Sequence, residues 1–213
     1  MSKRHSRIGM ELTSASYQKL IRRANYLGTT PTSIVYLMFY LYQDIDLSEG
    51  ELEEELNSIQ SDTKKKGLAI QLQPYLENII KVKRRYFFTN PQFISAYCNR
   101  FLKNGIGKWK ELEQKQGKRT AIFLIDSNLN EWFVNFSKET KISQTTLLNY
   151  ALMVADSDNF YVAKKSEREE KGVYLTESSL ETIEQYEYEK RASIIENCIR
   201  FFQDLNCNIK LEN

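Results

Sequence analysis

The sequence predicts a mainly α-helical protein in which short β-strands and pairs of helices alternate along the chain. Three observations lead to this fold class. Short stretches alternate between apolar and polar or small residues, as strands with one buried face do. Each stretch is followed by apolar residues at helical spacing. The same order of segments then recurs along the 213 residues.

The first unit opens on residues 7–12, RIGMEL, which alternate as a short strand does. Thr13 or Ser14 offers an N-cap, and apolar residues recur at helical spacing from there to Gly28. We therefore expect a strand followed by a first helix.

A second helix is expected directly afterwards. Thr29 or Thr30 caps it, and Pro31 suits its first turn, where a missing backbone N–H removes no hydrogen bond. Its apolar side is formed by Ile34, Val35, Met38, Phe39 and Tyr42. A single unit of this kind cannot cover its own apolar faces, and its strand needs a partner.

Composition excludes several classes of protein. Charged residues make up 27% and apolar residues 41% of the chain, which are ordinary values for a soluble globular protein. No apolar run approaches the roughly 18 residues of a membrane span. No apolar segment follows the basic start to form a signal peptide. We therefore expect a cytoplasmic protein that does not enter a membrane.

Residue types suited to catalysis or metal binding are scarce. Cys98, Cys198 and Cys207 are odd in number and lack metal-ligand spacing, which favours reduced thiols. His5 is the single histidine. The sequence contains no glycine-rich phosphate loop and no nucleophile motif. We expect no enzymatic activity, no metal and no cofactor.

Charge is unevenly distributed along the chain. The net charge is +2, but residues 43–63 hold eight acids and no base, whereas residues 64–119 hold fourteen bases and three acids. Residues 1–42 carry a net +5 and residues 120–213 a net −6. Two basic segments around an acidic spacer fit a polyanion such as nucleic acid. A solvated surface with uneven charge accounts for the same distribution equally well.

The first unit recurs from Gly67 to Leu102. When the first copy is shifted by sixty residues, its alternating strand and its Thr-x-Pro helix start coincide with those of the second copy. Pro31 then falls on Pro91. The acidic segment between the copies has one apolar stripe, interrupted by Ser, Asp and Gly, and we interpret it as a linker with a short helix.

Two further copies are predicted in the second half of the chain. The third opens on a strand whose outward residues, Thr120, Ile122 and Leu124, are mostly apolar, so both of its faces should be covered. The fourth has a very short strand. Because this half is net acidic, we assign residues 119–205 to self-association or to a protein partner. The predicted units span residues 6–43, 66–103, 119–155 and 171–205, with an acidic linker at 44–65 and further linkers at 104–118 and 156–170.

The first unit resembles the ribbon–helix–helix superfamily of DNA-binding proteins, of the MetJ and Arc type. The family pattern is an alternating strand, a cap, a first helix ending at Leu-Gly, a short Ser/Thr turn, and a second helix with paired apolar residues. Leu27–Gly28, Thr29–Thr32 and Ile34–Val35 match the last three elements. Family members pair two copies through their strands, so four copies imply two intramolecular pseudo-dimers. The simplest arrangement pairs the first copy with the second and the third with the fourth.

The resemblance implies that a two-stranded ribbon enters the major groove of DNA, where base edges show distinct donor and acceptor patterns. The base-contacting residues would be the outward side chains of the first two strands: Arg7, Gly9, Glu11, Ala69 and Gln71, with Gly67 beside them. Arg7 suits guanine, Gln71 adenine and Glu11 cytosine. Glu11 also argues against DNA binding, because phosphates repel a carboxylate that is not paired.

Phosphate contacts are expected at the starts of the second helices and in the basic residues ahead of the strands. These residues are Lys3, Arg4, Lys64, Lys65, Lys66, Thr29, Thr30, Thr32, Thr89 and Asn90. Thr29 and Thr89 are needed as helix caps whatever the function, so capping by itself is an alternative account of both.

These features predict a sequence-specific double-stranded DNA-binding protein, either a transcriptional repressor or an accessory factor for plasmid maintenance or conjugative transfer. Two different strands in one ribbon fit an asymmetric DNA site. The competing interpretation is an α-rich interaction scaffold of the same fold that does not read bases. In a third interpretation the repeats are amphipathic helix pairs, and the strands never form.

Overall fold

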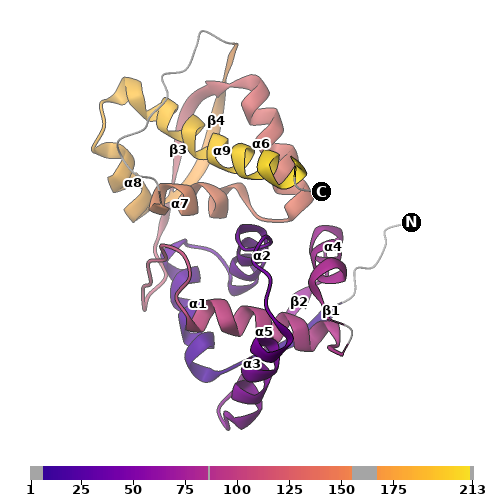
Figure 1. Cartoon of the computed structure of the whole chain (residues 1–213). Coiled ribbons are helices and arrows are strands. Elements are labelled where there is room, and N and C mark those ends of the chain that lie inside the picture. The colour runs from indigo at the N-terminus through magenta and orange to yellow at the C-terminus, as the bar shows by residue number, and fades with distance from the viewer. Residues whose placement is uncertain (1–6, 86, 155–166, 212–213) are drawn as a thin grey trace. The chain divides into compact units, whose positions relative to one another are not determined.

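The computed structural model describes residues 7–85, 87–154 and 167–211. The chain is mainly helical and contains two antiparallel two-stranded sheets (Figure 1). It divides into two compact units, Met1–Ala24 with Thr30–Glu113, and Asn25–Thr29 with Gln114–Asn213. One sheet belongs to each unit.

The elements occur in the order strand, helix, helix throughout the described chain, with one additional helix, α3. The first half contains β1 (Arg7–Leu12), α1 (Ser14–Tyr26), α2 (Pro31–Leu41), α3 (Glu49–Ser61), β2 (Lys66–Gln71), α4 (Pro74–Lys83) and α5 (Asn90–Lys103). The second contains β3 (Lys118–Asp126), α6 (Ser127–Thr140), α7 (Gln144–Val154), β4 (Arg168–Thr176), α8 (Glu177–Glu184) and α9 (Tyr188–Leu211). The strands therefore form, and the interpretation of the repeats as helix pairs without strands is wrong.

Side-chain caps explain where the second helices of the first unit begin. The Thr30 hydroxyl accepts a hydrogen bond from Ser33 N at 3.2 Å, so Thr30 rather than Thr29 caps α2. Thr89 and Gln92 form a capping box at the start of α5, in which each side chain accepts from the other residue's backbone N–H. When the first copy is shifted by sixty residues, Thr30 falls on position 90, so it lies one position after the Thr89 cap.

The strands pair as the simplest arrangement of the copies predicts. β1 runs antiparallel to β2, and the central pair is Gly9 opposite Ala69. Met10, Leu12 and Ile70 point to the other face and are buried. Since side chains alternate between the faces of a strand, this burial fixes which residues point outward.

Each second helix of the first unit holds the strand of the other copy. Ser95 on α5 accepts a hydrogen bond from Glu11 N at 2.9 Å, at the end of β1. Tyr36 on α2 donates from its hydroxyl to Gln71 O at 2.7 Å, at the end of β2. The two copies therefore share one core.

The acidic segment between β1 and β2 is more than a linker. Its helix α3 has 13 residues and packs Leu52 and Ile59 against the first unit. Glu55 is fully buried in this packing, where its carboxylate accepts from Asn99 Nδ2 at 2.6 Å and lies 3.5 Å from Arg100 Nη1. A buried carboxylate needs such partners, so α3 is anchored on α5 by a polar contact as well as by apolar packing.

The segment after α5 is also packed on the first unit. Arg22 Nε lies 2.9 Å from a Glu111 carboxylate oxygen, and the Arg23 guanidinium lies over the Trp109 ring at 4.9 Å. Trp109 Nε1 in turn donates to the Tyr42 hydroxyl at 2.6 Å. Residues 104–113 therefore return to α1 and α2 instead of leaving the unit directly.

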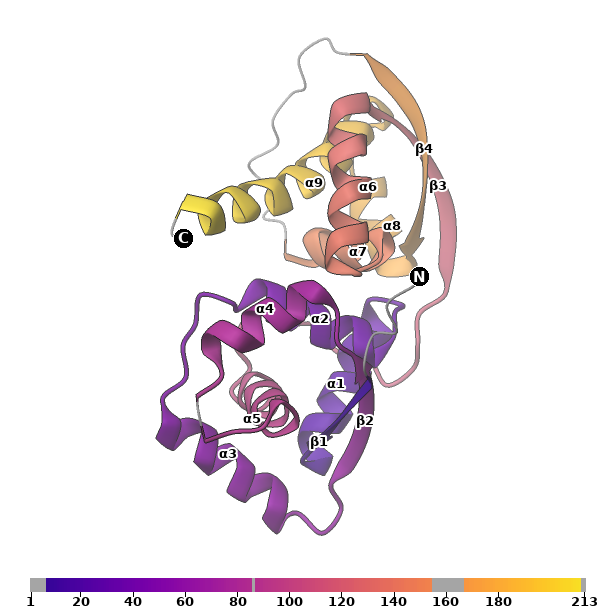
Figure 2. The ribbon, with the colours of Figure 1, turned by 90° about the vertical axis from the view of Figure 1, so that its right-hand side faces the viewer.

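The second unit repeats this plan with longer strands. β3 and β4 are nine residues each, and α6, α7, α8 and α9 lie on one side of them (Figure 2). Glu196 on α9 accepts from Asp126 N at 3.0 Å, and Asn149 on α7 accepts from Thr176 N at 3.2 Å. Here too each second helix binds the end of the other copy's strand.

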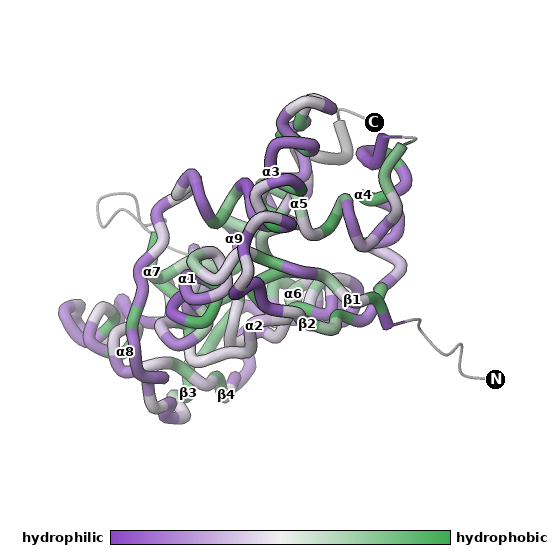
Figure 3. Tube along the Cα trace, turned by 90° about the horizontal axis from the view of Figure 1, so that it is seen from below, coloured by the Kyte–Doolittle hydropathy of each residue, from purple (hydrophilic) through white to green (hydrophobic). Residues whose placement is uncertain are grey.

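Hydropathy follows the packing along the chain. Hydrophobic and hydrophilic stretches alternate within the helices (Figure 3), which is the pattern of helices with one buried side. No helix within the described ranges is both long enough and apolar enough to cross a membrane.

Phe39 tests the shared core. It is fully buried and stacks on Tyr97 with ring centroids 4.6 Å apart. Phe39→Ala should lower the free energy of unfolding of the first unit by about 3–5 kcal/mol, because it leaves a cavity that the surrounding core fills only in part. Urea unfolding followed by circular dichroism measures the change.

The control is Val82→Ala, at a position that is 83% exposed, where we expect a change within about 0.5 kcal/mol. If Phe39→Ala costs no more than this control, the ring does not support the core as the structure indicates.

Candidate nucleic-acid interface

The outward face of the β1–β2 ribbon consists of three cross-strand pairs. They are Arg7–Gln71, Gly9–Ala69 and Glu11–Gly67. All of these residues are exposed, so the predicted base-contacting side chains lie together on one surface. Long polar side chains lie at the two ends of this surface, and the two residues in its middle are small.

The small central pair changes what can approach the ribbon. No atom lies within 4 Å of the place where a Cβ on Gly9 would stand. Ala69, opposite it, adds a single methyl group. A flat ligand surface can therefore come close to the backbone in the middle of the ribbon, while Arg7 and Gln71 reach outward at one end.

The carboxylate at the other end of this surface is paired. Glu11 Oε2 lies 2.9 Å from Lys65 Nζ, and both side chains are partly exposed. Such a pair contributes little to stability, because water screens it. Lys65 does lower the negative potential that Glu11 gives to the ribbon surface. This reduces the repulsion between Glu11 and the phosphates of a DNA duplex.

The threonine hydroxyls near the starts of α2 and α5 already have hydrogen-bond partners. The Thr30 and Thr89 side chains accept the capping hydrogen bonds of α2 and α5. Thr29 lies in the segment that belongs to the second unit, and its hydroxyl is 2.7 Å from that of Thr146. These contacts occupy the hydroxyls of all three residues, and what remains for an anion at the helix starts is backbone N–H.

The remaining predicted phosphate contacts fall into two groups. Lys64 and Lys65 are exposed in the turn that leads into β2, and Lys66 is exposed as the first residue of β2, whereas Thr32 and Asn90 are half-buried. Lys3 and Arg4 lie outside the described residues.

A groove of about 590 Å³ runs beside the ribbon. Gly9 and Glu11 line it on the ribbon side, Gln92 on the first turn of α5, and Gln60 and Lys65 at the end of α3 and in the turn after it. The start of α5 and the turn of residues 62–65 therefore both lie at the edge of the ribbon. Gln60 and Gln92 add amide groups there that sequence reasoning missed, and the Thr-x-x-Gln cap was the one available signal for Gln92.

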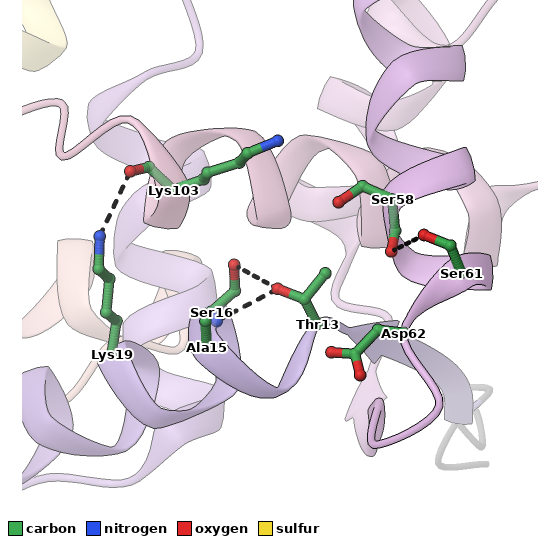
Figure 4. Close-up of a pocket in the computed structure, with 8 residues that line it drawn as sticks. All are labelled: Thr13, Ala15, Ser16, Lys19, Ser58, Ser61, Asp62 and Lys103. Atoms are coloured by element: carbon green, nitrogen blue, oxygen red, sulfur yellow. Dashed lines mark hydrogen bonds between the residues drawn. The ribbon is translucent and has the colours of Figure 1, made fainter.

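A second, smaller hollow of about 330 Å³ lies between the start of α1 and the end of α3, and Asp62 is one of the residues that line it (Figure 4). Asp62 accepts from Ser14 N at 2.6 Å and from Lys64 N at 2.7 Å, and these hydrogen bonds lower the pKa of its carboxyl group. Lys19 and Lys103 also line this hollow, and Lys19 Nζ donates to Lys103 O at 3.3 Å (Figure 4). Asp62 therefore joins the start of α1 to the turn that precedes β2.

Two cysteine thiols of the described chain are buried. Burial raises the pKa of Cys98, and it raises that of Cys198 to about 12, so both thiols stay protonated. Within the described residues, no three His, Cys, Asp or Glu side chains gather in a way that could hold a metal ion.

Comparison with known proteins identifies no relative. No family model, no curated protein and no solved structure matches the chain.

Tyr36 tests how the end of the ribbon is held. Its hydroxyl donates to Gln71 O at 2.7 Å and accepts from Gln71 N at 3.2 Å. Tyr36→Phe should lower the free energy of unfolding by about 1 kcal/mol, because both backbone groups lose this partner. It should also speed hydrogen exchange at the Gln71 amide, as measured by NMR.

Tyr174→Phe is the matched control, because the Tyr174 ring is 57% exposed on the other ribbon. It should leave both quantities unchanged. Unaltered exchange at Gln71 in Tyr36→Phe would show that this hydroxyl does not hold the strand end.

Proposed function

We propose that the chain is a sequence-specific double-stranded DNA-binding protein that places the β1–β2 ribbon in the major groove. The observation that carries this proposal is the outward face of the ribbon. It exposes Arg7 opposite Gln71 at one end and the small pair Gly9 and Ala69 in the middle. These are the side chains that a ribbon needs to approach base edges and to distinguish them.

The dimensions and the chemistry of the ribbon both support this proposal. A two-stranded ribbon fits a groove about 12 Å wide. Arg7 can donate two hydrogen bonds to guanine, and Gln71 can donate to and accept from adenine. Because the opposite end of the ribbon carries Glu11 and Gly67, its two halves differ, and an asymmetric DNA site would suit it.

The fold that we propose is a tandem ribbon–helix–helix arrangement with two intramolecular pseudo-dimers. The exchanged contacts support it, since Tyr36 on α2 holds β2 and Ser95 on α5 holds β1. The same exchange in the second unit, through Asn149 and Glu196, supports a second pair of copies. Two copies that share their cores in this way replace the two chains of a family dimer.

Backbone contacts to DNA would come from the sides of the ribbon. The exposed Lys64 precedes β2, the exposed Lys66 is the first residue of β2, and Lys65 is paired with Glu11. The first turn of α5 meets the groove beside the ribbon at Gln92. Backbone N–H groups at such a helix start attract phosphate oxygens, and lysines hold phosphates without reading sequence. A protein of this kind would act as a repressor or as an accessory factor in plasmid maintenance or conjugative transfer.

The second candidate is an interaction scaffold of the same fold without base readout. The acidic helix α3 favours it, because Glu53 and Glu54 are exposed in the same unit as the ribbon. Carboxylates repel a duplex. The paired Glu11 weakens this argument at the ribbon itself, so DNA binding remains the better supported function.

Selection from a pool of random-sequence duplexes tests base readout. The wild-type chain should enrich an asymmetric motif. Arg7→Ala/Gln71→Ala should lose the motif and keep weak, salt-sensitive binding, because base contacts specify the sequence whereas phosphate contacts hold the duplex. Both residues are exposed, so the fold should be kept. If the wild type enriches nothing and binds weakly even at low salt, the scaffold is the better account.

Lys66→Ala tests the phosphate contacts separately. It should weaken binding to all duplexes alike and reduce the slope of log K against log salt by about 1. Lys138→Ala removes the same charge from the exposed side of α6 in the second unit and should leave the slope unchanged. If the two variants give the same slope of log K against log salt, Lys66 does not contact a phosphate.

A further inference from the structure

A basic segment joins α4 to α5 in the first unit. Lys81, Arg84 and Arg85 are exposed in it, and we call these three residues the basic flank. Lys83 is not counted with them, because its ammonium nitrogen lies 2.7 Å from an Asp46 carboxylate oxygen. Three exposed positive charges so close together give the surface a positive potential, which attracts a polyanion.

Local contacts hold the basic flank beside the start of α5. Arg84 donates from Nη1 to the carbonyl oxygen of Phe88. Phe88 N donates to Arg85 O at 3.1 Å, which keeps Arg85 close to Phe88. Phe88 is buried, and Thr89 caps α5 directly after it. The two arginines are therefore anchored to the first turn of α5.

The first turn of α5 connects the basic flank with the ribbon. Pro91 and Gln92 line the same groove as Gly9 and Gly67. Gln92 Oε1 accepts from the backbone N–H and from the hydroxyl of Thr89, both at 2.9 Å. Because the cap uses this oxygen, the NH₂ group is the part of the Gln92 side chain that can donate to a ligand. A duplex on the ribbon would bring its backbone towards this turn.

The first copy has no such flank. After the shift of sixty residues, the corresponding positions are Ile21, Ala24 and Asn25, and none of them is charged. The turn between α1 and α2, Asn25–Thr29, belongs to the second unit, where the Thr29 hydroxyl lies 2.7 Å from that of Thr146. The turn before α5 is therefore basic and exposed, whereas the turn before α2 is uncharged and packed.

We propose that Lys81, Arg84 and Arg85 hold the sugar–phosphate backbone of a duplex on the α5 side of the ribbon, together with the Gln92 amide. This inference rests on the proposed function of the ribbon. Because the α2 side has no matching charges, these backbone contacts lie on one side of the base motif only. They add affinity without reading sequence, as phosphate contacts do.

An anionic membrane fits the basic flank less well than a duplex does. Val82 and Phe87, in the same segment, are 83% and 72% exposed, and basic residues beside apolar ones also suit a membrane surface. A helix that lies on a membrane needs an apolar face directed outward. α4 instead buries its apolar residues Leu76 and Ile80 in the core.

The double variant Lys81→Ala/Arg85→Ala in the full chain tests the basic flank. Both side chains are exposed, so the fold should be kept. On the duplex that the wild type selects, affinity should fall at least tenfold. The slope of log K against log salt should become shallower by about 2, because two fewer phosphates are neutralised. The selected base motif should stay the same.

The matched control is Lys138→Ala/Arg200→Ala, which removes the same two charges from exposed positions on α6 and α9. It measures the effect of net charge by itself and should leave the slope unchanged.

Phosphate ethylation interference locates the contacts. Ethyl groups on phosphates at one side of the selected motif should weaken binding of the wild type. The same ethyl groups should have little further effect on Lys81→Ala/Arg85→Ala, because that variant has already lost the contacts.

Three outcomes would overturn the inference. If the wild type selects a motif and Lys81→Ala/Arg85→Ala binds it as tightly as the control variant does, the basic flank does not hold DNA, and the function of the ribbon stands. If the wild type selects no motif, the proposed function fails as well. If the double variant loses binding to phosphatidylserine vesicles and keeps its duplex affinity, the basic flank binds a membrane surface.

Discussion

A two-stranded β-ribbon is not stable in water without further packing, and this constraint organises the first unit. β1 and β2 each leave backbone groups unpaired at the end of the strand, and a side chain from the other copy's second helix supplies the partner. Neither copy can therefore be removed without exposing the inner face of the other strand. The acidic helix α3 extends the same core, because its Glu55 is buried against Asn99 and Arg100 on α5. The outward face of the ribbon takes no part in this packing and is free to carry function.

The second unit meets the same constraint with different chemistry on its outer face. Glu196 and Asn149 take the place of Ser95 and Tyr36 at the strand ends. The inner face is again apolar, with Val173 and Leu175 buried. Because stability comes from the inner face, the outer face can vary, and one plan of pairing supports a polar surface on one ribbon and an apolar surface on the other.

The period-2 alternation of residues 7–12 was sufficient to predict β1 and the side chains on each of its faces, because a strand with one buried face has no other pattern. The cap at Thr89 was equally local, since it depends on Gln92 three residues later. Contacts between distant segments were not predictable in this way. Nothing near Glu11 in the sequence indicates that Lys65 pairs with it, and nothing near Thr29 indicates Thr146.

The sequence by itself determined the order of the elements and the direction in which the strand residues point, because periodicity and capping act over a few residues. Tertiary structure decided the rest. It showed that the acidic segment is a packed helix, because the burial of Glu55 depends on partners more than forty residues away. It also showed which residues stand beside the ribbon, where Gln60, Lys65 and Gln92 meet around one groove. Such groupings depend on the register of strands and the docking of helices, which pairing between distant segments sets and local pattern does not.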